Sequence, residues 1–445
     1  MSFARQSLGS LLALVFGVAV SVLLPRVLGA EARGEYQLAV KLAGLVLAVA
    51  QWGIPEVLLQ LMAERRATTG ALIGTSLSLG LAGAALMALV LGLAAPLFRD
   101  NLLRGVEPVL LWLTLGGSIA SLLALLARRF IQLGGRLDIY NGLDVGRTLV
   151  FLALVAIGGA VLPRQALGPT LAWLIGEIVL AIVAIAYLWR MFRPSNAIET
   201  PKRDGRLGRT PGGPWQPRPA LVAELARSGA PIQFGLLGMF LGSEGGAFVL
   251  NANLDVASVG IYSVALSVAR LVLQVSIALR TALQPRLLTA EQDSAAVTAR
   301  VTRHALLWMV AMACALAIGS PLAPFIFTRE FTAVGPVLVL LLPGMVAYGV
   351  WQLVASHLLR LGRRGLLAAI AWLFGLSSIL LQAIGAQVFG LSGAAAGLSI
   401  AYVAATVVVL VVFVQLSGRP ARELLPVPGD LAFSVGLTRR VLATR

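Results

Sequence analysis

The chain has 445 residues, of which 58% are hydrophobic and only 12% are charged, and its mean hydropathy is +0.90. Soluble proteins carry roughly twice that share of charged residues, so this composition excludes a water-soluble globular protein. Apolar runs of about 18 or more residues recur from end to end, and each is long enough to cross a ~30 Å hydrocarbon core.

About twelve membrane-spanning helices are expected in chain order, because that many apolar runs reach the required length. Their predicted bounds are Leu8–Leu28, Tyr36–Leu59, Ala71–Phe98, Pro108–Leu126, Leu143–Leu162, Pro169–Trp189, Pro231–Leu250, Val259–Leu283, His304–Phe327, Val334–Ala355, Leu366–Val388 and Gly393–Leu416. If the N-terminus is cytoplasmic, most of the 35 lysines and arginines fall in cytoplasmic segments, which is typical of the inner side of a membrane. Both termini are therefore expected in the cytoplasm, and the net charge of +16 indicates topology and not a nucleic-acid partner.

The predicted spans divide evenly around one long polar segment. We expect an N-terminal six-helix bundle at residues 1–190, a cytoplasmic Pro/Gly/Arg-rich linker at 191–228, a C-terminal six-helix bundle at 229–416 and a cytoplasmic tail at 417–445. The prolines and glycines of the linker are typical of a flexible segment, with room for a short helix at its end.

An internal repeat supports the same division. At a constant offset of 226 residues, Gly34 aligns with Gly260 and Tyr36 with Tyr262, and three further identities follow. Each copy lies at the predicted outer turn between the first two helices of its half. Because six spans precede the second copy, both bundles have the same orientation, an arrangement typical of transporters that rock two bundles around a central site.

Several motifs of this chain, in their order and spacing, resemble bacterial polysaccharide flippases of the multidrug/oligosaccharidyl-lipid/polysaccharide exporter superfamily. They lie at the first helical hairpin, around the eighth predicted helix and in the last third of the chain, and comprise Leu28–Tyr36, Gly53–Pro55, Ala63–Arg66, Val259–Ala265, Gln284–Leu287, Leu361–Arg363 and Phe389–Ala395. The similarity covers nearly the whole chain except the linker and the tail.

The resemblance implies an all-α polytopic protein with two six-helix bundles around a central cavity that opens alternately to each side. It also implies transport of a polyprenyl-pyrophosphate-linked oligosaccharide from the cytoplasmic to the periplasmic leaflet of the bacterial inner membrane, without a cofactor. The expected partners are this lipid-linked oligosaccharide, the membrane lipids and the polysaccharide polymerase machinery.

Arg270 is the leading candidate for substrate binding. A charge inside a span costs roughly 2.5–3.5 kcal/mol on insertion scales, so it usually faces a cavity or a partner. With Ser263, Ser267, Gln274 and Thr281 it forms one polar stripe at helical spacing, which would line a wet path. A guanidinium fork suits a pyrophosphate, although an ion pair with Glu244 or Glu177 would also explain Arg270.

Other polar side chains within or near the spans have two interpretations each. Lys41 would grip a diphosphate together with Arg270, or snorkel to the interface. Arg26 and Asn251 are further candidates for substrate contact, with an interfacial anchor and an interhelical hydrogen bond as the alternatives. Glu244 and Glu177 would couple transport to an ion, because desolvation favours the protonated carboxyl, or would simply pair with Arg270.

No catalytic or metal-binding motif accompanies these residues. The chain has two histidines and one cysteine, and none stands at metal-ligand spacing. The chain has two lysines, Lys41 and Lys202, and neither belongs to a phosphate-binding Gly-Lys-Ser/Thr loop. The sequence therefore favours a flippase and not an enzyme. A cation-coupled multidrug exporter or a peptidoglycan-precursor flippase is the alternative, and a polytopic glycosyltransferase or polymerase is a distant one.

Overall fold

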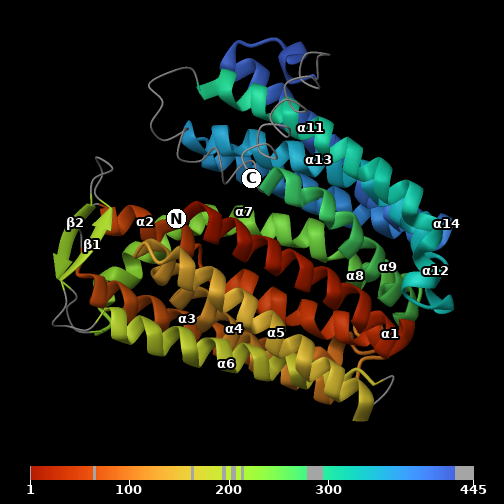
Figure 1. Cartoon of the computed structure of the whole chain (residues 1–445), viewed down its shortest axis with the longest axis horizontal. Helices are drawn as coiled ribbons and strands as arrows, with labels where there is room; N and C mark the ends of the chain where they lie inside the picture. The colour runs from red at the N-terminus through yellow and green to blue at the C-terminus, as the bar shows by residue number, and fades with distance from the viewer. Residues whose placement is uncertain are drawn as a thin grey trace. The chain divides into compact units, whose positions relative to one another are not determined.

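The structure is a computed structural model that describes residues 2–63, 67–161, 165–192, 197–201, 207–211, 215–277 and 294–425. Nearly all of these residues are helical (Figure 1). The chain divides into two compact units, one of Met1–Phe240 with Asp255–Gly260 and one of Leu241–Leu254 with Ile261–Arg445. The domain bounds expected at residues 190 and 229 stay a prediction.

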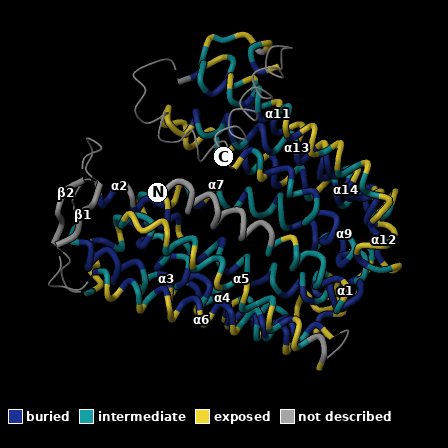
Figure 2. The backbone as a smooth tube through the Cα atoms, viewed as in Figure 1, coloured by how far each residue is buried: buried dark blue, intermediate teal, exposed yellow. Residues whose placement is uncertain are grey.

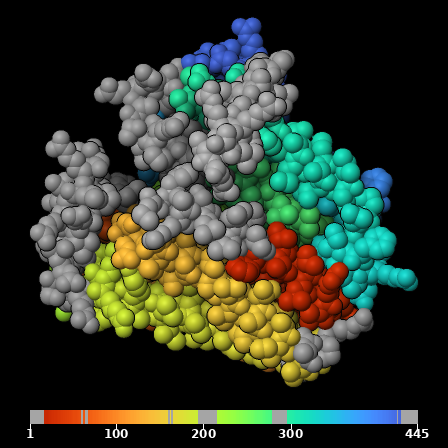
Figure 3. All heavy atoms as spheres, viewed as in Figure 1, coloured from red at the N-terminus to blue at the C-terminus, as the bar shows by residue number. Residues whose placement is uncertain are grey.

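The first unit contains the elements from the N-terminus through most of α7. Its elements are α1 (Ser2–Ala50), α2 (Ile54–Ala63), α3 (Thr69–Ala94), the 3₁₀ turn η1 (Ala95–Phe98), α4 (Pro108–Leu133), α5 (Leu137–Val161), α6 (Leu167–Met191), β1 (Ala197–Pro201), β2 (Leu207–Pro211) and most of α7 (Pro219–Glu244). Helix α4 packs against α3 and α6, and α5 packs against α6 (Figure 1). Their atoms form a continuous surface, coloured orange to yellow-green in Figure 3.

The second unit is built from the remaining helices. They are α8 (Gly246–Asn253), most of α9 (Val256–Ala269), η2 (Arg270–Val272), α11 (Ser294–Gly319), η3 (Ser320–Leu322), α12 (Ala323–Ile326), η4 (Arg329–Phe331), α13 (Val334–Arg360), α14 (Arg364–Ser417) and η5 (Ala421–Leu424). Helix α13 packs along α14 and α11, and α8 packs on α14.

The two longest helices each fold back on themselves at a glycine. Helix α1 bends at Gly29 and α14 at Gly390, where φ is 73° and 61°, values that glycine adopts without strain. In a straight helix, positions 381 and 397 would lie ~24 Å apart at 1.5 Å per residue. In α14, however, a Cβ atom at Gly397 would stand 2.5 Å from the Leu381 carbonyl oxygen. Each bend coincides with a turn predicted between two spans.

The surface of the described helices is suited to lipid. Large apolar side chains are exposed along α3, α6 and α11, among them Leu93 (68%), Ile182 (63%) and Ile318 (81%), and such positions are yellow in Figure 2. Eight of the described helices are long and apolar enough to cross a membrane, or nine if the bent pair α7 and α8 is one span. The protein is therefore a multi-pass membrane protein. Helix α14 alone contains both of the last two predicted spans, so the number of long helices is not the number of spans. The count of twelve spans stays a prediction.

Two features of the expected linker differ from the prediction. Instead of a wholly flexible segment, its described residues include an antiparallel pair of strands, β1 and β2, in which Ala197 faces Pro211. Helix α7 begins at Pro219 and continues through Pro231 into the predicted seventh span. The backbone N–H groups in the first turn of a helix have no acceptor within the helix, so proline loses nothing there by lacking one. This explains the start at Pro219. The composition alone could not show these pairings.

The repeat brings its matched glycines into one contact within the first unit. A Cβ atom at Gly34 would collide with the Val256 carbonyl group, and one at Gly260 would collide with the carbonyl group of Ala30. Val256 and Ala30 are themselves related by the offset of 226 residues. When residue i contacts j and the counterpart of j contacts the counterpart of i, the two segments are related by a two-fold axis. The sequence repeat is thus a structural repeat at this contact.

This reciprocal contact predicts a matched pair of destabilised variants. Gly34→Ala and Gly260→Ala should each lower the stability of the purified protein by about 1–3 kcal/mol, because the added methyl group overpacks a backbone contact. The thermal unfolding temperature in detergent measures this effect. Gly142→Ala in α5, where nothing lies within 4 Å of the added methyl group, is the control and should not lower it. Equal unfolding temperatures for all three variants would contradict the contact.

Candidate functional site

Arg270 lies where α9 changes its winding. The helix is α-helical from Val256 to Ala269, and the 3₁₀ turn η2 begins at Arg270 itself. A short 3₁₀ stretch inside a longer helix often marks a hinge or a functional position. The sequence predicted an uninterrupted span here, so this irregularity is a feature that the polar stripe alone did not indicate.

Arg270 forms an ion pair with Glu244. Its Nη2 donates to Glu244 Oε1 at 2.6 Å and to the carbonyl oxygen of Ser243 at 3.3 Å. Glu244 ends α7, next to the break of 40° that separates α7 from α8. Of the two acids proposed as partners for Arg270, the structure selects Glu244. A charge-assisted hydrogen bond of this length compensates a guanidinium that would otherwise be costly inside a span.

A buried hydrogen-bond chain supports the helix break from α14. Ser378 Oγ donates to the Gly242 carbonyl oxygen at 2.8 Å, and Gln382 Nε2 donates to Ser378 Oγ at 2.8 Å. The hydroxyl of Tyr262 in turn donates to Gln382 Oε1 at 3.0 Å. These hydrogen bonds satisfy a backbone carbonyl beside the break and join α7, α9 and α14. Gln382 is buried, and both polar atoms of its amide are engaged in these hydrogen bonds.

An aromatic cluster stands beside the same arginine. Tyr402 stacks on Tyr348 and on Phe374 with ring centroids 4.7 and 4.5 Å apart, and Trp351 meets Phe374 edge-on at 5.3 Å. Tyr402 and Tyr348 both interact electrostatically with Arg270. Tyr402, Trp351 and Phe374 are buried and hold the wall of the site in place, whereas Tyr348 is half-buried and borders its surface.

The guanidinium of Arg270 retains donors for a ligand. Both of its hydrogen bonds use Nη2, and among the described residues neither Nε nor Nη1 has an acceptor. The side chain is 36% exposed. Of the predicted stripe, Gln274 is exposed, and Ser267 is half-buried, with its hydroxyl donating to the Ser263 carbonyl oxygen at 2.7 Å. Thr281 lies outside the described residues.

A second charged site lies in the first unit and was missed from the sequence. Arg147 of α5 donates from Nη1 to Glu177 Oε1 of α6 at 2.7 Å. The pair borders a cavity of about 240 Å³ that Gly17, Val20 and Tyr36 of α1 also line. Arg147 falls inside the predicted span Leu143–Leu162, so an inventory of every charge within the spans would have found it. Glu177 is thus paired with Arg147.

The two sites share one arrangement although their charges come from different helices. Tyr36 interacts electrostatically with Arg147 and Glu177, whereas Tyr262 does so with Arg270 and Glu244. The two tyrosines are buried and occupy matching positions of the repeat. Each unit therefore places one arginine–glutamate pair beside the repeated tyrosine.

The remaining predicted site residues belong to α1 and α8. Lys41 and Arg26 belong to α1 in the first unit, where Lys41 is half-buried and Arg26 exposed. The joint grip of Lys41 and Arg270 on a diphosphate stays a prediction. Asn251 is in the second unit on α8 and is fully buried, so its amide has no surface for a ligand in this conformation. No group of three or more potential metal-ligating side chains occurs among the described residues.

Glu35 is a strongly perturbed titratable group outside the predicted spans. Burial, together with the smaller effect of the negative charges of Glu107 and Glu31, raises the pKa of its carboxyl to about 7. Glu35 lies near the start of the helical segment of α1 that follows the bend at Gly29. The start of this segment therefore changes charge near neutral pH.

A family model for polysaccharide biosynthesis proteins matches residues 3–291, more than half of the 445 residues. No curated protein sequence matches the chain.

The fold is that of known transporters. The lipid II flippase MurJ in an inward closed conformation has a TM-score of 0.67 at 14% identity, over 94% of this chain and 88% of that one. A multidrug resistance MATE family transporter of the MOP superfamily has TM-scores of 0.57 inward-facing and 0.54 outward-facing, both at 16% identity. These matches cover 93% of this chain and 94% or 95% of the transporter. Identities this low show a shared fold, and that fold occurs in both inward-facing and outward-facing states.

The Arg270–Glu244 pair predicts strong coupling between its two members. Arg270→Gln and Glu244→Gln should each lower the free energy of unfolding. The double variant should be about 1–3 kcal/mol more stable than the sum of the two single losses predicts, because it leaves no unpaired charge. Chemical unfolding in detergent measures the cycle. The exposed pair Arg136–Asp138, 3.1 Å apart, is the control and should couple by less than about 1 kcal/mol. Additive effects at Arg270 and Glu244 would refute the pair.

The raised pKa of Glu35 predicts a decline in stability towards neutral pH. Between pH 4.5 and about 7 the unfolded carboxyl is ionised while the folded one keeps its proton, so the unfolding free energy falls as the pH rises through this window. Glu35→Gln should flatten that part of a plot of unfolding temperature against pH. Asp100→Asn, at an exposed position, should leave the wild-type curve unchanged. The assignment fails if Glu35→Gln also keeps the wild-type curve.

Proposed function

The chain belongs to the polysaccharide biosynthesis protein family, and on this premise we propose that it is a flippase for a polyprenyl-pyrophosphate-linked oligosaccharide. The substrate passes from the cytoplasmic to the periplasmic leaflet of the bacterial inner membrane, and both termini face the cytoplasm. Its membrane-transporter fold and the inward-facing and outward-facing states of similar structures support alternating access. Translocation changes no covalent bond, so the chain needs no catalytic group or cofactor.

The observation that carries the substrate assignment is the partly exposed guanidinium of Arg270. Its Nε and Nη1 face no acceptor among the described residues, and each of them forms, together with Nη2, an edge that can bind two phosphoryl oxygens with defined geometry. A pyrophosphate keeps its negative charge at neutral pH and is the part of the substrate shared by every sugar composition. Gln274, which is exposed, supplies a polar contact for the sugars, and the half-buried ring of Tyr348 supplies an aromatic one.

Glu244 gives this site a means of coupling. Bound to Arg270 it neutralises the cation, so a pyrophosphate has to compete with the carboxylate for the same Nη2. Protonation of Glu244 weakens the pair and frees the guanidinium for substrate, whereas loss of the proton restores the pair and favours release. Glu177 and Arg147 supply a second such pair in the first unit. Lys41 and Arg26 are further cations for the diphosphate.

The alternatives differ in the charge of the transported molecule. A multidrug exporter of cationic compounds needs an acidic site, whereas the acid nearest to Arg270 is already neutralised by it. A peptidoglycan-precursor flippase would use the same arginine for the same kind of anion, and the two anionic substrates are separated only by a transport assay with each of them.

Arg270→Gln should abolish most transport. In cells that depend on this chain for export, surface polysaccharide should be lost and lipid-linked oligosaccharide should accumulate on the cytoplasmic side, with a transport rate reduced about tenfold or more, since a charged hydrogen bond contributes about 1.5–3 kcal/mol. Arg270→Lys should be intermediate, because it keeps the charge without the fork.

The double variant Arg270→Gln/Glu244→Gln controls for folding. It should be as stable as the wild type to within about 1 kcal/mol and still fail to transport. Arg364→Gln, at an exposed position at the start of α14, should export normally. Full export by Arg270→Gln would remove this residue from the site. Export of a cationic dye in place of the lipid-linked sugar would refute the proposed function.

A further inference from the structure

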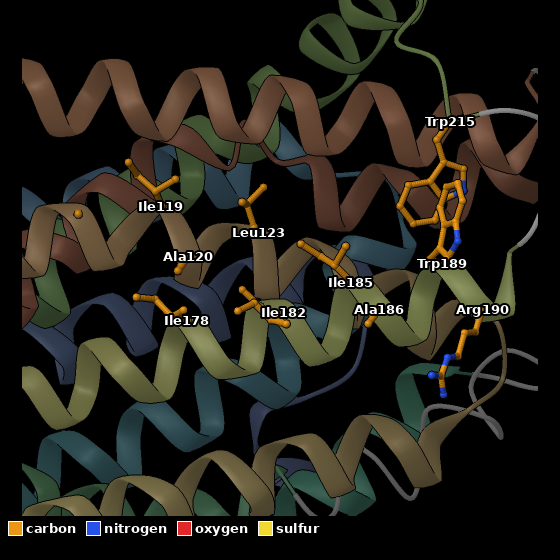
Figure 4. Close-up of a pocket in the computed structure, with 12 residues that line it drawn as sticks. Ile119, Ala120, Leu123, Ile178, Ile182, Ile185, Ala186, Trp189, Arg190 and Trp215 are labelled. Carbon is orange, nitrogen blue, oxygen red and sulfur yellow. The ribbon is translucent and has the colours of Figure 1, made fainter.

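A large apolar groove runs along the first unit between α4 and α6, and Figure 4 shows it at close range. Its volume is about 730 Å³, within the roughly 300–1,000 Å³ typical of small-molecule sites. Small residues such as Gly116 and Ala120 on α4 and Ala186 on α6 open it between the ridges of larger side chains. The ridge residue Ile182 is 63% exposed, so the groove faces the space that lipid fills.

One end of the groove has different chemistry. Trp189 and Arg190 of α6 and Trp215 lie together there, whereas Ile119 and Ile178 line the opposite end (Figure 4). The two indoles meet edge-on with centroids 5.1 Å apart. Arg190 is exposed in the last turn of α6, and its guanidinium has no hydrogen-bond or ion-pair partner among the residues that the structure describes. Tryptophan and arginine side by side are typical of the level of lipid headgroups.

Trp215 is held in this place by contacts from two helices. Its Nε1 donates to the Phe192 carbonyl oxygen at 3.4 Å. Its backbone lies so close to α3 that a Cβ atom at Gly74 would stand 2.7 Å from the Trp215 carbonyl carbon. The N–H of Arg218 donates to Thr75 Oγ1 at 3.0 Å. The segment that follows β2 is thus fastened across α3, and it closes one end of the groove with an aromatic wall.

We propose that the α4/α6 groove binds an anionic phospholipid, with one acyl chain in the groove and the phosphate at Arg190. This ligand is separate from the transported lipid-linked sugar. The apolar part from Ile178 to Trp189 is ~16 Å long at 1.5 Å per residue. That length is about half of a ~30 Å hydrocarbon core and matches the acyl chain of one leaflet. A polyprenyl chain, which is far longer, would leave most of its length outside.

Charge selects the headgroup. Arg190 offers a guanidinium whose fork pairs with phosphate oxygens, and it shares this end of the groove with the exposed indole of Trp189 and the half-buried indole of Trp215. Because α6 is expected to end at the cytoplasmic face, the ligand belongs to the cytoplasmic leaflet, where basic groups attract anionic lipids. A zwitterionic lipid gains less from the same site, since its own cation opposes Arg190.

Native mass spectrometry of the detergent-purified full-length chain tests the proposal with phosphatidylglycerol and phosphatidylcholine of identical acyl chains. The wild type should bind phosphatidylglycerol more tightly than phosphatidylcholine. Arg190→Gln should weaken that binding about fivefold, which corresponds to ~1 kcal/mol per basic residue near a headgroup. Ala186→Trp, which fills the groove, should weaken the binding of both lipids.

Two matched controls separate the groove from general lipid contact. Ala85→Trp adds the same ring at an exposed position of α3, and Arg364→Gln removes an exposed arginine at the start of α14. Both should bind lipid as the wild type does. The proposal is overturned if the controls lose phosphatidylglycerol as strongly as the groove variants, or if the wild type binds both lipids equally. Polyprenyl phosphate is added in a parallel measurement. The proposal is also overturned if Ala186→Trp keeps phosphatidylglycerol and loses only polyprenyl phosphate, which would identify the groove as a substrate site.

Discussion

A charge inside a lipid-embedded helix has to be compensated, and in each unit a glutamate compensates an arginine. Arg147 is held by Glu177, and Arg270 by Glu244. Helix geometry adapts to these pairs: α9 tightens into a 3₁₀ turn at Arg270, and the chain bends next to Glu244. Because an unpaired charge would be expelled from the apolar region, the pairs fix where hydrated surface can exist in a protein that is otherwise apolar. Candidate functional positions follow from that constraint.

Backbone glycines have a complementary role, because they allow helices to approach and to turn. Gly29 and Gly390 adopt left-handed conformations where α1 and α14 fold back. Gly34 and Gly260 permit the reciprocal contact between the two copies of the repeat. Polar side chains then stabilise the interrupted backbone. Gln233 accepts from the Gly53 N–H at 2.9 Å at the junction of α1 and α2, and Ser378 donates to Gly242 near the break of α7.

The class of fold could be predicted from the sequence, because composition, span length and the repeat are properties of the chain itself. The pairing of Glu244 with Arg270 was foreseen as one of two options, since both residues fall inside spans. Arg147 was missed, although its position within a predicted span was visible. The strand pair β1–β2 and the 3₁₀ turn at Arg270 depend on tertiary contacts that periodicity does not encode. Burial too depends on tertiary packing: Asn251, near a predicted span end, is fully buried in this structure, and its contact with substrate stays a prediction.

The central claim is that the stripe of Ser267, Arg270 and Gln274 faces water inside the membrane. Gln274→Cys and Ile318→Cys test it directly in a chain whose native cysteine is replaced by Cys314→Ser, because both positions are exposed in the structure. The measurement is the rate of labelling by a charged, membrane-impermeant maleimide added to both sides of native membranes. The account predicts rapid labelling at position 274 and none at position 318, which faces lipid. Equal protection of the two cysteines would contradict a hydrated path at Arg270.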